Sequence, residues 1–312
     1  MLSELFTRQL SDAPEPIGVG WPVLGHIYAR FEVAMATRRV GFKIDTREVQ
    51  LPRPAAPGEL RSVPLEQARP VLRQVYESVL PTRPGWSSRD ERWWGRVLAD
   101  PPGRRRGATE LRVTVHEGGT GPDGYVLWRG RVDWGPTGAG GEIRVEELVA
   151  ADVDAYQSLW RFLLGMDLSR SVSAWSASTD ERLLQLADDP RQLGATLSTG
   201  LFLRIFDLPT ALTARRYAAP LDVVIEVSDQ MFERNAGRWR LTAETDKASC
   251  TQTQDSADLA CTVAELSAVY LGGISLASLA SVGRVHERQP GALARASAAF
   301  GWHCAPSAIE FF

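Results

Sequence analysis

Tyr28 is the side chain of this sequence best placed to transfer a proton. It lies in Leu24–Phe31, LGHIYARF, which is expected to form a short helix directly after a strand. A phenol at that point could face a cleft at the strand's end and donate a proton to a departing thiolate, which is general-acid chemistry. The alternative is a core tyrosine whose hydroxyl is satisfied by a hydrogen bond.

The final residues, Ser307–Phe312, suggest a second group for proton transfer. They read SAIEFF, and chain ends normally fray into water unless packing holds them, so two terminal phenylalanines suggest a buried end. Burial of Phe311 and Phe312 would carry the terminal α-carboxylate inward with the rings. The alternative is a last β-strand whose aromatic side chains complete a core while the carboxylate reaches solvent.

Other catalytic and metal-binding patterns lack support in this sequence. The four histidines share no two-turn or hairpin spacing, and His303 and Cys304 are adjacent, so their side chains point apart and we expect no metal site. Gly-x-Ser-x-Gly, Walker and dinucleotide glycine patterns do not occur. The arginine-rich Gly103–Thr109 precedes a predicted strand instead of a helix, which fits a solvated hairpin shoulder better than a phosphate loop.

Composition limits the class of protein and its partners. A chain of 312 residues and 34.3 kDa is expected to form two or three domains. Its 44% hydrophobic and 23% charged residues are typical of globular proteins, and a net charge of -3 argues against a general nucleic-acid or membrane-surface role. The odd number of cysteines, three, favours a reducing cytoplasm. The most apolar stretch, Val269–Val282, is too short to span a bilayer, and no export signal is recognisable.

The first part of the chain predicts strand, helix and strand. Glu15–Val23 alternates as a strand, the Tyr28 helix follows, and Ala36–Thr46 reads as a second strand, which together predict a βαβ-like unit. Gln50–Pro64 then concentrates four prolines, which is typical of an extended linker that interrupts helices and strands. We expect a domain boundary there.

The middle of the chain predicts helices followed by strands. Asp152 is expected to cap the last helix of this part and Gly165 to end it. The expected helices are Pro64–Leu80, Arg89–Asp100 and Ala151–Asp167, and the expected strands are Glu110–Glu117, Gly124–Trp134 and Gly141–Ala150.

The last third begins with the dense apolar run Leu201–Pro209 and predicts a mixture of strands and helices. The expected strands are Leu221–Asp229, Gly237–Thr245, Ala248–Thr253 and the terminal Ser307–Phe312, and the expected helices are Thr210–Tyr217, Thr262–Gly273 and Pro290–Trp302. The whole chain is therefore expected to be of the α+β class.

Taken together, these segments resemble one family. The motifs IYARF, ATRRVGFKID, LFLRIFDLPTALTARRYA, DVVIEVSD, AELSAVYLGG and LASLA, with the aromatic C-terminus, are similar to the Eis (enhanced intracellular survival) N-acetyltransferases. The resemblance runs over nearly all of the chain and is most specific in Leu201–Phe312. It implies two GNAT-like domains, a domain with the sterol-carrier-protein fold, and a homo-hexamer. It also implies acetyl transfer from acetyl-CoA to amines of aminoglycosides, polyamines or lysine-type compounds, without a metal.

The resemblance also implies roles for particular residues. The family's general acid is the tyrosine of the motif that matches IYARF, here Tyr28, and its general base is the C-terminal carboxylate, here that of Phe312. Glu310 resembles a position that contacts the cationic substrate, and Phe202 and Asp207 fall in the motif that borders the pocket. No residue is assigned to the cofactor.

Two departures from the family pattern affect what we expect. A glycine commonly follows the phenylalanine of the tyrosine motif, whereas Glu32 follows Phe31 here. GNAT domains bind the pyrophosphate of CoA through an Arg/Gln-x-x-Gly-x-Gly/Ala loop at a helix N-terminus, which precedes the tyrosine helix and is missing here. We therefore expect an N-terminally truncated first domain, with either a start codon assigned too far downstream or a natural loss of the donor site.

These expectations give three domains and two possible functions. Residues 1–52 are the expected remnant of the first GNAT domain, residues 53–200 a second GNAT-like domain without a CoA loop, and residues 201–312 a sterol-carrier-like domain. The first function is acetyl-CoA-dependent N-acetylation. The second is that of a shortened, non-catalytic relative that acts as a scaffold or small-molecule binding protein. Release of free CoA thiol in the presence of an amine discriminates between them.

Overall fold

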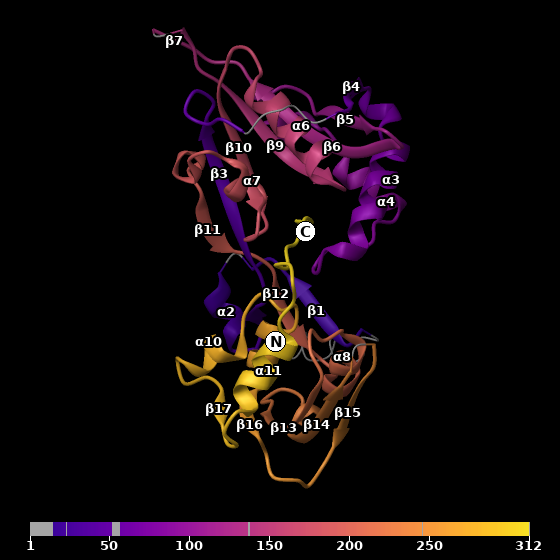
Figure 1. Cartoon of the computed structure of the whole chain (residues 1–312), viewed down its shortest axis with the longest axis vertical. Coiled ribbons are helices and arrows are strands. Elements are labelled where there is room, and N and C mark those ends of the chain that lie inside the picture. Colours follow the sequence, from indigo (N-terminus) through magenta and orange to yellow (C-terminus); the bar gives the residue numbers. More distant parts are fainter. Residues whose placement is uncertain (1–14, 23, 52–56, 137, 245, 312) are drawn as a thin grey trace. The chain divides into compact units, whose positions relative to one another are not determined.

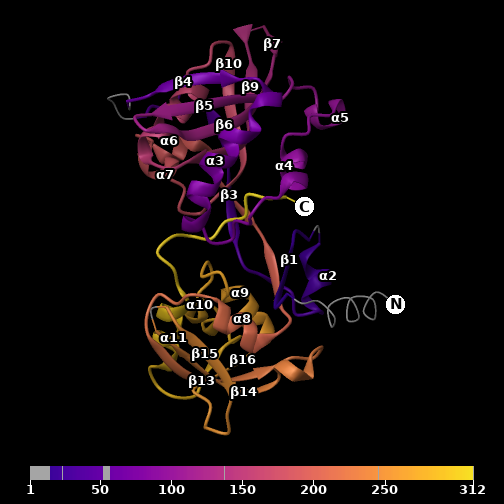
Figure 2. The same cartoon turned by 90° about the vertical axis from the view of Figure 1, so that its right-hand side faces the viewer.

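The computed structural model describes residues 15–22, 24–51, 57–136, 138–244 and 246–311 (Figure 1). Two compact units make up the chain. Unit 1 comprises Met1–Arg38 and Thr199–Phe312, and unit 2 comprises Arg39–Ser198, so that the sequence of unit 2 is inserted into that of unit 1. Each unit combines sheets with helices, as Figure 2 also shows, which confirms the expected α+β class.

Unit 2 is built on a seven-stranded sheet in the order β11-β3-β10-β9-β6-β5-β4. Neighbours β9 and β10 run parallel, whereas the pairs β3–β10, β6–β9, β5–β6 and β4–β5 are antiparallel. The strands are β3 (Arg38–Asp45), β4 (Glu59–Val63), β5 (Arg112–Gly118), β6 (Gly121–Arg131), β9 (Gly141–Ala150), β10 (Ser169–Ala177) and β11 (Thr196–Thr199).

The main helices of unit 2 contact this sheet. Helix α6 (Val153–Leu164) lies against β5, β6 and β9 and buries Leu159 and Leu163 in the core. Asp152 caps it by accepting from the Ala155 amide at 2.9 Å, and the Gly165 amide closes it, as the sequence predicted. The other helical and hairpin elements are α3 (Arg69–Val79), α4 (Glu91–Val97), α5 (Pro102–Arg105), α7 (Leu183–Leu186), the 3₁₀ turns η1 (Leu65–Gln67), η2 (Leu80–Thr82) and η3 (Pro190–Leu193), and the strands β7 (Trp134–Gly135) and β8 (Gly138–Ala139).

Unit 1 contains two sheets. A five-stranded sheet has the order β15-β14-β13-β16-β17, and a three-stranded sheet has the order β1-β12-β2. The strands are β1 (Ile17–Gly20), β2 (Ala34–Met35), β12 (Phe202–Ile205), β13 (Leu221–Ser228), β14 (Gly237–Ala243), β15 (Ala248–Gln252), β16 (Leu259–Thr262) and β17 (His286–Glu287). The helices are α2 (Gly25–Ala29), α8 (Leu208–Ala214), α9 (Val263–Val269), α10 (Leu276–Ala280), α11 (Ala292–Phe300) and the 3₁₀ turn η4 (Glu233–Asn235).

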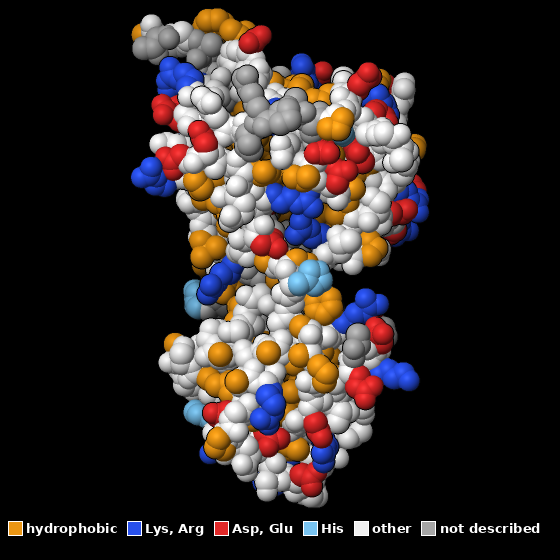
Figure 3. All heavy atoms as spheres, viewed as in Figure 1, with side chains coloured by type: hydrophobic (Ala, Val, Ile, Leu, Met, Phe, Trp, Pro, Cys, Tyr) orange, Lys and Arg blue, Asp and Glu red, His pale blue; other side chains and the backbone are white. Residues whose placement is uncertain are grey.

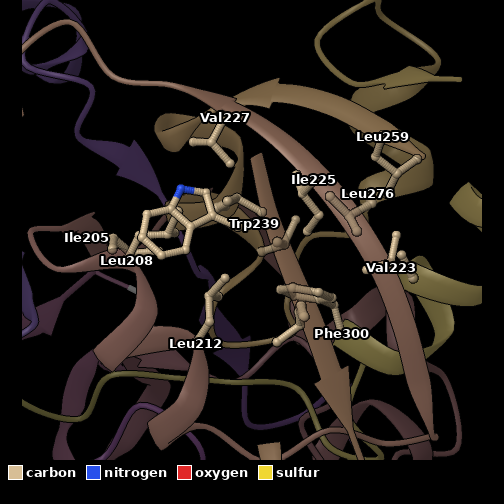
Figure 4. Close-up of a cluster of buried hydrophobic side chains, with 14 of the residues drawn as sticks. Ile205, Leu208, Leu212, Val223, Ile225, Val227, Trp239, Leu259, Leu276 and Phe300 are labelled. Atoms are coloured by element: carbon tan, nitrogen blue, oxygen red, sulfur yellow. The ribbon is translucent and has the colours of Figure 1, made fainter. Parts of the chain in front are cut away.

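The core of unit 1 fills the space between the five-stranded sheet and its helices (Figure 4). Alternate residues of β13, among them Ile225, point inward because successive side chains of a strand face opposite sides. They meet Leu212 of α8 and Phe300 of α11. The Trp239 indole of β14 donates to the Asn235 carbonyl at 2.9 Å, so its polar edge is satisfied inside the core.

Three expectations about local structure are wrong. Residues 307–311 of the predicted terminal strand form no strand, and Phe312 lies outside the described residues. The expected βαβ-like unit does not form, because β1 pairs with β12 while β3 pairs with β10 of a different sheet. The proline-rich segment was expected to lack helices and strands, but Glu59–Val63 pairs with β5 because it follows the last proline before Pro64 and has free backbone donors.

The surface of each unit carries both signs of charge. Figure 3 shows acidic and basic side chains interspersed on the face in view. Among the helices that the structure describes, none is long and apolar enough to cross a membrane.

Truncation of Ile225 tests the core of unit 1. Ile225 is 1% exposed, so Ile225→Ala is expected to lower the free energy of unfolding by about 2–5 kcal/mol through lost burial and the cavity left behind. Urea denaturation of the full chain measures this value. The control, Val282→Ala at a side chain that is 68% exposed, is expected to change it by less than about 0.5 kcal/mol. Equal effects of the two substitutions would contradict the described core.

Candidate active site

Strand β12 positions the candidate site in unit 1. It is the central strand of its sheet, with β1 on one side and β2 on the other. Leu203 and Ile205 alternate into the hydrophobic core, and both are fully buried. Phe202 and Arg204 therefore face the opposite side of the sheet.

Phe202 lies against the start of the helix that carries Tyr28. A Cβ atom placed on Gly25, the first residue of α2, would be 3.2 Å from Cζ of Phe202. Such a distance is an unusually tight contact, so the absence of a side chain at Gly25 lets the ring lie close to the helix. Gly20 at the end of β1 pairs with Phe202 across the sheet. The predicted residues Tyr28 and Phe202 thus belong to neighbouring segments.

Tyr28 lies near the end of α2 and is half-buried. The helix was predicted from the sequence and is confirmed, and none of its five residues is buried. The Tyr28 carbonyl accepts from the amides of Phe31 at 2.9 Å and Val33 at 3.4 Å, which closes a turn directly after the helix. The turn fixes the backbone of Tyr28 although its side chain is partly accessible.

The C-terminal segment contacts the loop between β1 and α2. The Trp21 indole nitrogen donates to the Glu310 carbonyl at 2.8 Å, and the Trp21 and Phe311 rings lie 5.6 Å apart between centroids. Glu310 is buried, whereas Phe311 is 59% exposed, so the expected burial of the Phe311 ring is wrong. The segment that leads to Phe312 therefore lies beside the loop that leads to Tyr28.

Asp207 caps a helix. Its side chain accepts from the Thr210 amide at 2.9 Å at the start of α8, and its own amide donates to the Pro16 carbonyl at 3.2 Å. An acidic N-cap satisfies a free amide of the first turn and interacts favourably with the helix dipole. The described contacts of Asp207 are thus structural, and its predicted contact with substrate stays a prediction.

Three buried charged residues next to Tyr28 were not predicted as a cluster. Arg204 of β12 places Nη2 at 2.7 Å from Oδ1 of Asp229 and at 3.5 Å from Oε2 of Glu32. Glu32 lies within the turn that follows Tyr28, and Asp229 follows β13. A charged residue within the apolar run Leu201–Pro209 was the available signal, because buried strands exclude unpaired charges.

The two carboxyl groups of this cluster differ in acidity. Burial of Glu32, followed by its hydrogen bond to Asp229 and the negative charge there, raises the pKa of Glu32 to about 7. Burial also opposes ionisation of Asp229, but hydrogen bonds from Asn235 and Phe232 and the charge of Arg204 outweigh it and lower its pKa. Asp229 therefore carries the negative charge that pairs with Arg204, and Glu32 holds a proton up to about neutral pH.

The described residues can also be compared with the requirements of a metal site and of a cysteine nucleophile. No group of three or more His, Cys, Asp or Glu residues within the described ranges could hold a metal ion. Among the described residues, Cys250 and Cys261 are free thiols. Burial, followed by the negative charge of Asp207, raises the pKa of the Cys250 thiol to about 12, which makes it a poor nucleophile at neutral pH.

Comparison with known proteins assigns the chain to a family. Residues 85–205 match the acetyltransferase (GNAT) domain and residues 208–308 match the sterol carrier protein domain. The N-acetyltransferase Eis of Mycobacterium tuberculosis is 31% identical over 96% of this chain and 72% of its own length. This chain belongs to the Eis family of GNAT N-acetyltransferases. It is accordingly an acetyltransferase, a class of enzyme that takes the acetyl group from acetyl-CoA.

Relatives from Streptomyces are more similar in sequence. An uncharacterised N-acetyltransferase of Streptomyces avermitilis is 38% identical over 98% of this chain and 76% of its own length. One from Streptomyces coelicolor is 39% identical over 98% of this chain and 75% of its own length. This Eis-family chain thus spans about three quarters of these relatives, and the matches do not bear out the expected truncation of the first domain.

Solved structures share the fold. The crystal structure of Eis1 from Mycobacterium abscessus is 30% identical, covers 100% of this chain and 77% of its own, and superimposes with a TM-score of 0.82. A GCN5-related N-acetyltransferase from Anabaena variabilis reaches a TM-score of 0.83 at 22% identity, over 99% of this chain and 77% of its own. The predicted combination of GNAT and sterol-carrier folds is confirmed.

Substitution of Trp21 tests how the C-terminal segment of this Eis-family chain is held. Trp21→Phe keeps an aromatic ring but removes the donor to the Glu310 carbonyl, which is expected to cost about 1 kcal/mol. Local opening, and with it the rate at which carboxypeptidase Y releases Ile309, is expected to rise about fivefold. The control, Trp134→Phe at an exposed tryptophan of unit 2, is expected to leave the rate unchanged. Identical rates in Trp21→Phe and the unsubstituted chain would contradict this account.

Proposed function

We propose that this protein transfers the acetyl group of acetyl-CoA to a small amine, with Tyr28 as general acid and the carboxylate of Phe312 as general base. The observation that carries the proposal is the contact of Trp21 with Glu310 and Phe311, because it brings the C-terminal segment to the loop that leads into the Tyr28 helix. The residues that precede Phe312 and the loop that precedes the Tyr28 helix therefore meet within unit 1.

The proposed reaction is a nucleophilic acyl substitution. The terminal carboxylate removes a proton from the substrate ammonium, and the free amine attacks the thioester carbonyl. A C–N bond forms and the C–S bond breaks, and the departing thiolate takes its proton from the hydroxyl of Tyr28. A terminal carboxylate can act as the base because it is attached directly to the backbone, so no side-chain torsion has to be fixed. The Trp21 contacts hold the two preceding residues, Glu310 and Phe311.

Acetyl-CoA enters this proposal as a substrate whose binding residues are not assigned. The sequence contains no Arg/Gln-x-x-Gly-x-Gly/Ala pattern, so no described helix N-terminus fits the family's way of holding the pyrophosphate. The part of the site that we propose is therefore the acceptor side, where Phe202 provides an aromatic wall and Glu310 a carboxyl group for a cationic amine. Asp207 borders the same region at the start of α8.

The resemblance to the Eis family supports several finer proposals. The acceptors are amines of aminoglycosides, polyamines or lysine-type compounds, and the assembly is a homo-hexamer. The odd number of cysteines, three, fits a cytoplasmic location. We also propose the division into residues 1–52, 53–200 and 201–312, although the compact units of the structure group the chain differently. Sedimentation of the purified chain would show whether six copies of 34.3 kDa associate.

Removal of either proton-transfer group is expected to abolish most of the turnover. Tyr28→Phe and deletion of Phe312 are each expected to lower the rate of CoA thiol release in the presence of an amine by about 10²–10⁴-fold. Addition of one glycine after Phe312 is expected to have a similar effect, because it moves the carboxylate by roughly 3.5 Å. A thiol-reactive chromophore measures the release.

Two control variants keep the proposed groups intact. Phe312→Leu retains a terminal carboxylate and is expected to keep turnover within about tenfold of the unsubstituted chain. Tyr270→Phe removes a hydroxyl that donates to the Ala211 carbonyl elsewhere in unit 1, and we expect no loss of turnover. Full activity of Tyr28→Phe, or of the chain without Phe312, would refute the corresponding assignment.

A further inference from the structure

Glu32 holds a backbone conformation that suits glycine better than glutamate. Its φ angle is 55°, in the left-handed region that side chains disfavour. It lies between Phe31 and Val33, whose amides both donate to the Tyr28 carbonyl. The turn that follows Tyr28 therefore depends on Glu32 staying in a conformation that its own backbone opposes, and something outside the turn has to hold it.

The side chain of Glu32 supplies that anchor. Its Oε2 accepts from the Gln230 amide at 3.1 Å and lies 3.5 Å from Nη2 of Arg204. These contacts tie the Tyr28 turn to β12 and to the segment after β13, which are distant in sequence. Among the described residues, Nε and Nη1 of Arg204 have no hydrogen-bond partner, so Glu32 and Asp229 supply the acceptors of the guanidinium.

The buried guanidinium of Arg204 thus pairs with the carboxyl groups of both Glu32 and Asp229. Asp229 accepts from the amides of Met231 and Phe232, both at 2.9 Å, and from Asn235 at 2.9 Å, which stabilises its ionised form. Glu32 accepts one amide bond and is the member of the pair that keeps a proton. Two further charged side chains of these segments stack on aromatic rings: Arg30 lies 4.7 Å from the Phe31 ring centroid, and Arg234 lies 5.0 Å from that of Phe232. The protonated Glu32 carboxyl hydrogen-bonds to Asp229, which adds to the contacts that Glu32 makes with the Gln230 amide and Arg204.

We propose that Glu32 is a positioning residue for Tyr28: its contacts with the Gln230 amide and Arg204 hold the turn after Tyr28, and the proton that it shares with Asp229 strengthens that hold. The proposal rests on the proposed function only for the catalytic role of Tyr28. Ionisation of Glu32 would place two facing carboxylates around one guanidinium and remove the hydrogen bond between them.

The direction of the pH effect follows from the cluster. The pKa of Glu32 is raised from 4.5 to about 7 in the folded chain, so its contribution to stability is complete below pH 4.5 and is lost as the pH rises through about 7. Asp229 stays ionised throughout this range because its pKa is lowered. The turn is therefore expected to be ordered in mildly acidic solution and to loosen above neutral pH.

A measurement without turnover tests the cluster directly. The chain has six tyrosines, so labelling with [¹⁵N]tyrosine gives a small set of amide signals, of which Tyr28→Phe identifies the one of interest. In the unsubstituted chain the Tyr28 amide signal is expected to shift with a midpoint near pH 7. In Glu32→Gln, which stays neutral and keeps the side-chain length, the shift is expected to disappear. A Tyr28 signal that does not titrate near neutral pH, or titrates equally in Glu32→Gln, overturns the proposal.

Turnover separates positioning from a purely structural role. The ratio of kcat of Glu32→Gln to kcat of the unsubstituted chain is expected to be near one at about pH 6 and about threefold to tenfold higher at about pH 8.5. KM is expected to change little, because misplacement of a catalytic group acts on kcat. Glu32→Gly relieves the backbone strain, so the turn no longer needs the side-chain anchor, and its kcat is expected to be independent of this titration. A constant ratio across pH overturns the positioning role. Complete inactivity of the unsubstituted chain refutes the proposed function. The Tyr28 amide titration does not depend on turnover, so it still tests whether Glu32 controls the turn after Tyr28.

Discussion

The candidate site depends on strand β12 being paired on both sides. Hydrogen bonds to β1 and β2 keep β12 extended, so its side chains alternate between the two faces of the sheet. Phe202 and Arg204 lie on one face and Leu203 and Ile205 on the other. The buried face joins the core of unit 1, so the orientation of the opposite face cannot change without loss of core packing. The Tyr28 helix and Glu32 are both held against that opposite face, one through Gly25 and the other through Arg204.

The charge on this strand has an energetic cost that the neighbouring segments offset. A guanidinium that is only 2% exposed loses most of its hydration, and its attraction to carboxylates compensates for that loss only in good geometry. Asp229 meets this requirement with several amide donors around it. Glu32 meets it only partly, which is why it retains a proton. The two carboxyl groups therefore differ in acidity because the packing around Arg204 gives Asp229 more hydrogen-bond donors than Glu32.

Local patterns in the sequence predicted the individual elements well and their partners poorly. Alternation and capping residues identified the α2 helix, β13 and the cap at Asp152, because these depend on residues close in sequence. The pairing of β1 with β12 and the contact of Trp21 with Glu310 join residues far apart in the chain, which periodicity does not encode. Family resemblance, and not pattern, connected Tyr28 with the C-terminus. Glu32 departs from the family pattern after Phe31, but its contact with Arg204, which also pairs with Asp229, joins residues far apart in the chain and has no local sequence signal.

The insertion of unit 2 into the sequence of unit 1 also orders events during synthesis. Strand β1 leaves the ribosome long before β12, and at about 5–20 residues per second the intervening segment takes roughly 10–40 seconds to translate. Unit 2 is complete before β12 emerges, and β12 is the strand that pairs with β1 among the described residues. The nascent chain therefore carries an exposed strand during that interval, which makes it a substrate for chaperones that bind extended segments. Slower translation would lengthen this period of vulnerability without altering the final structure.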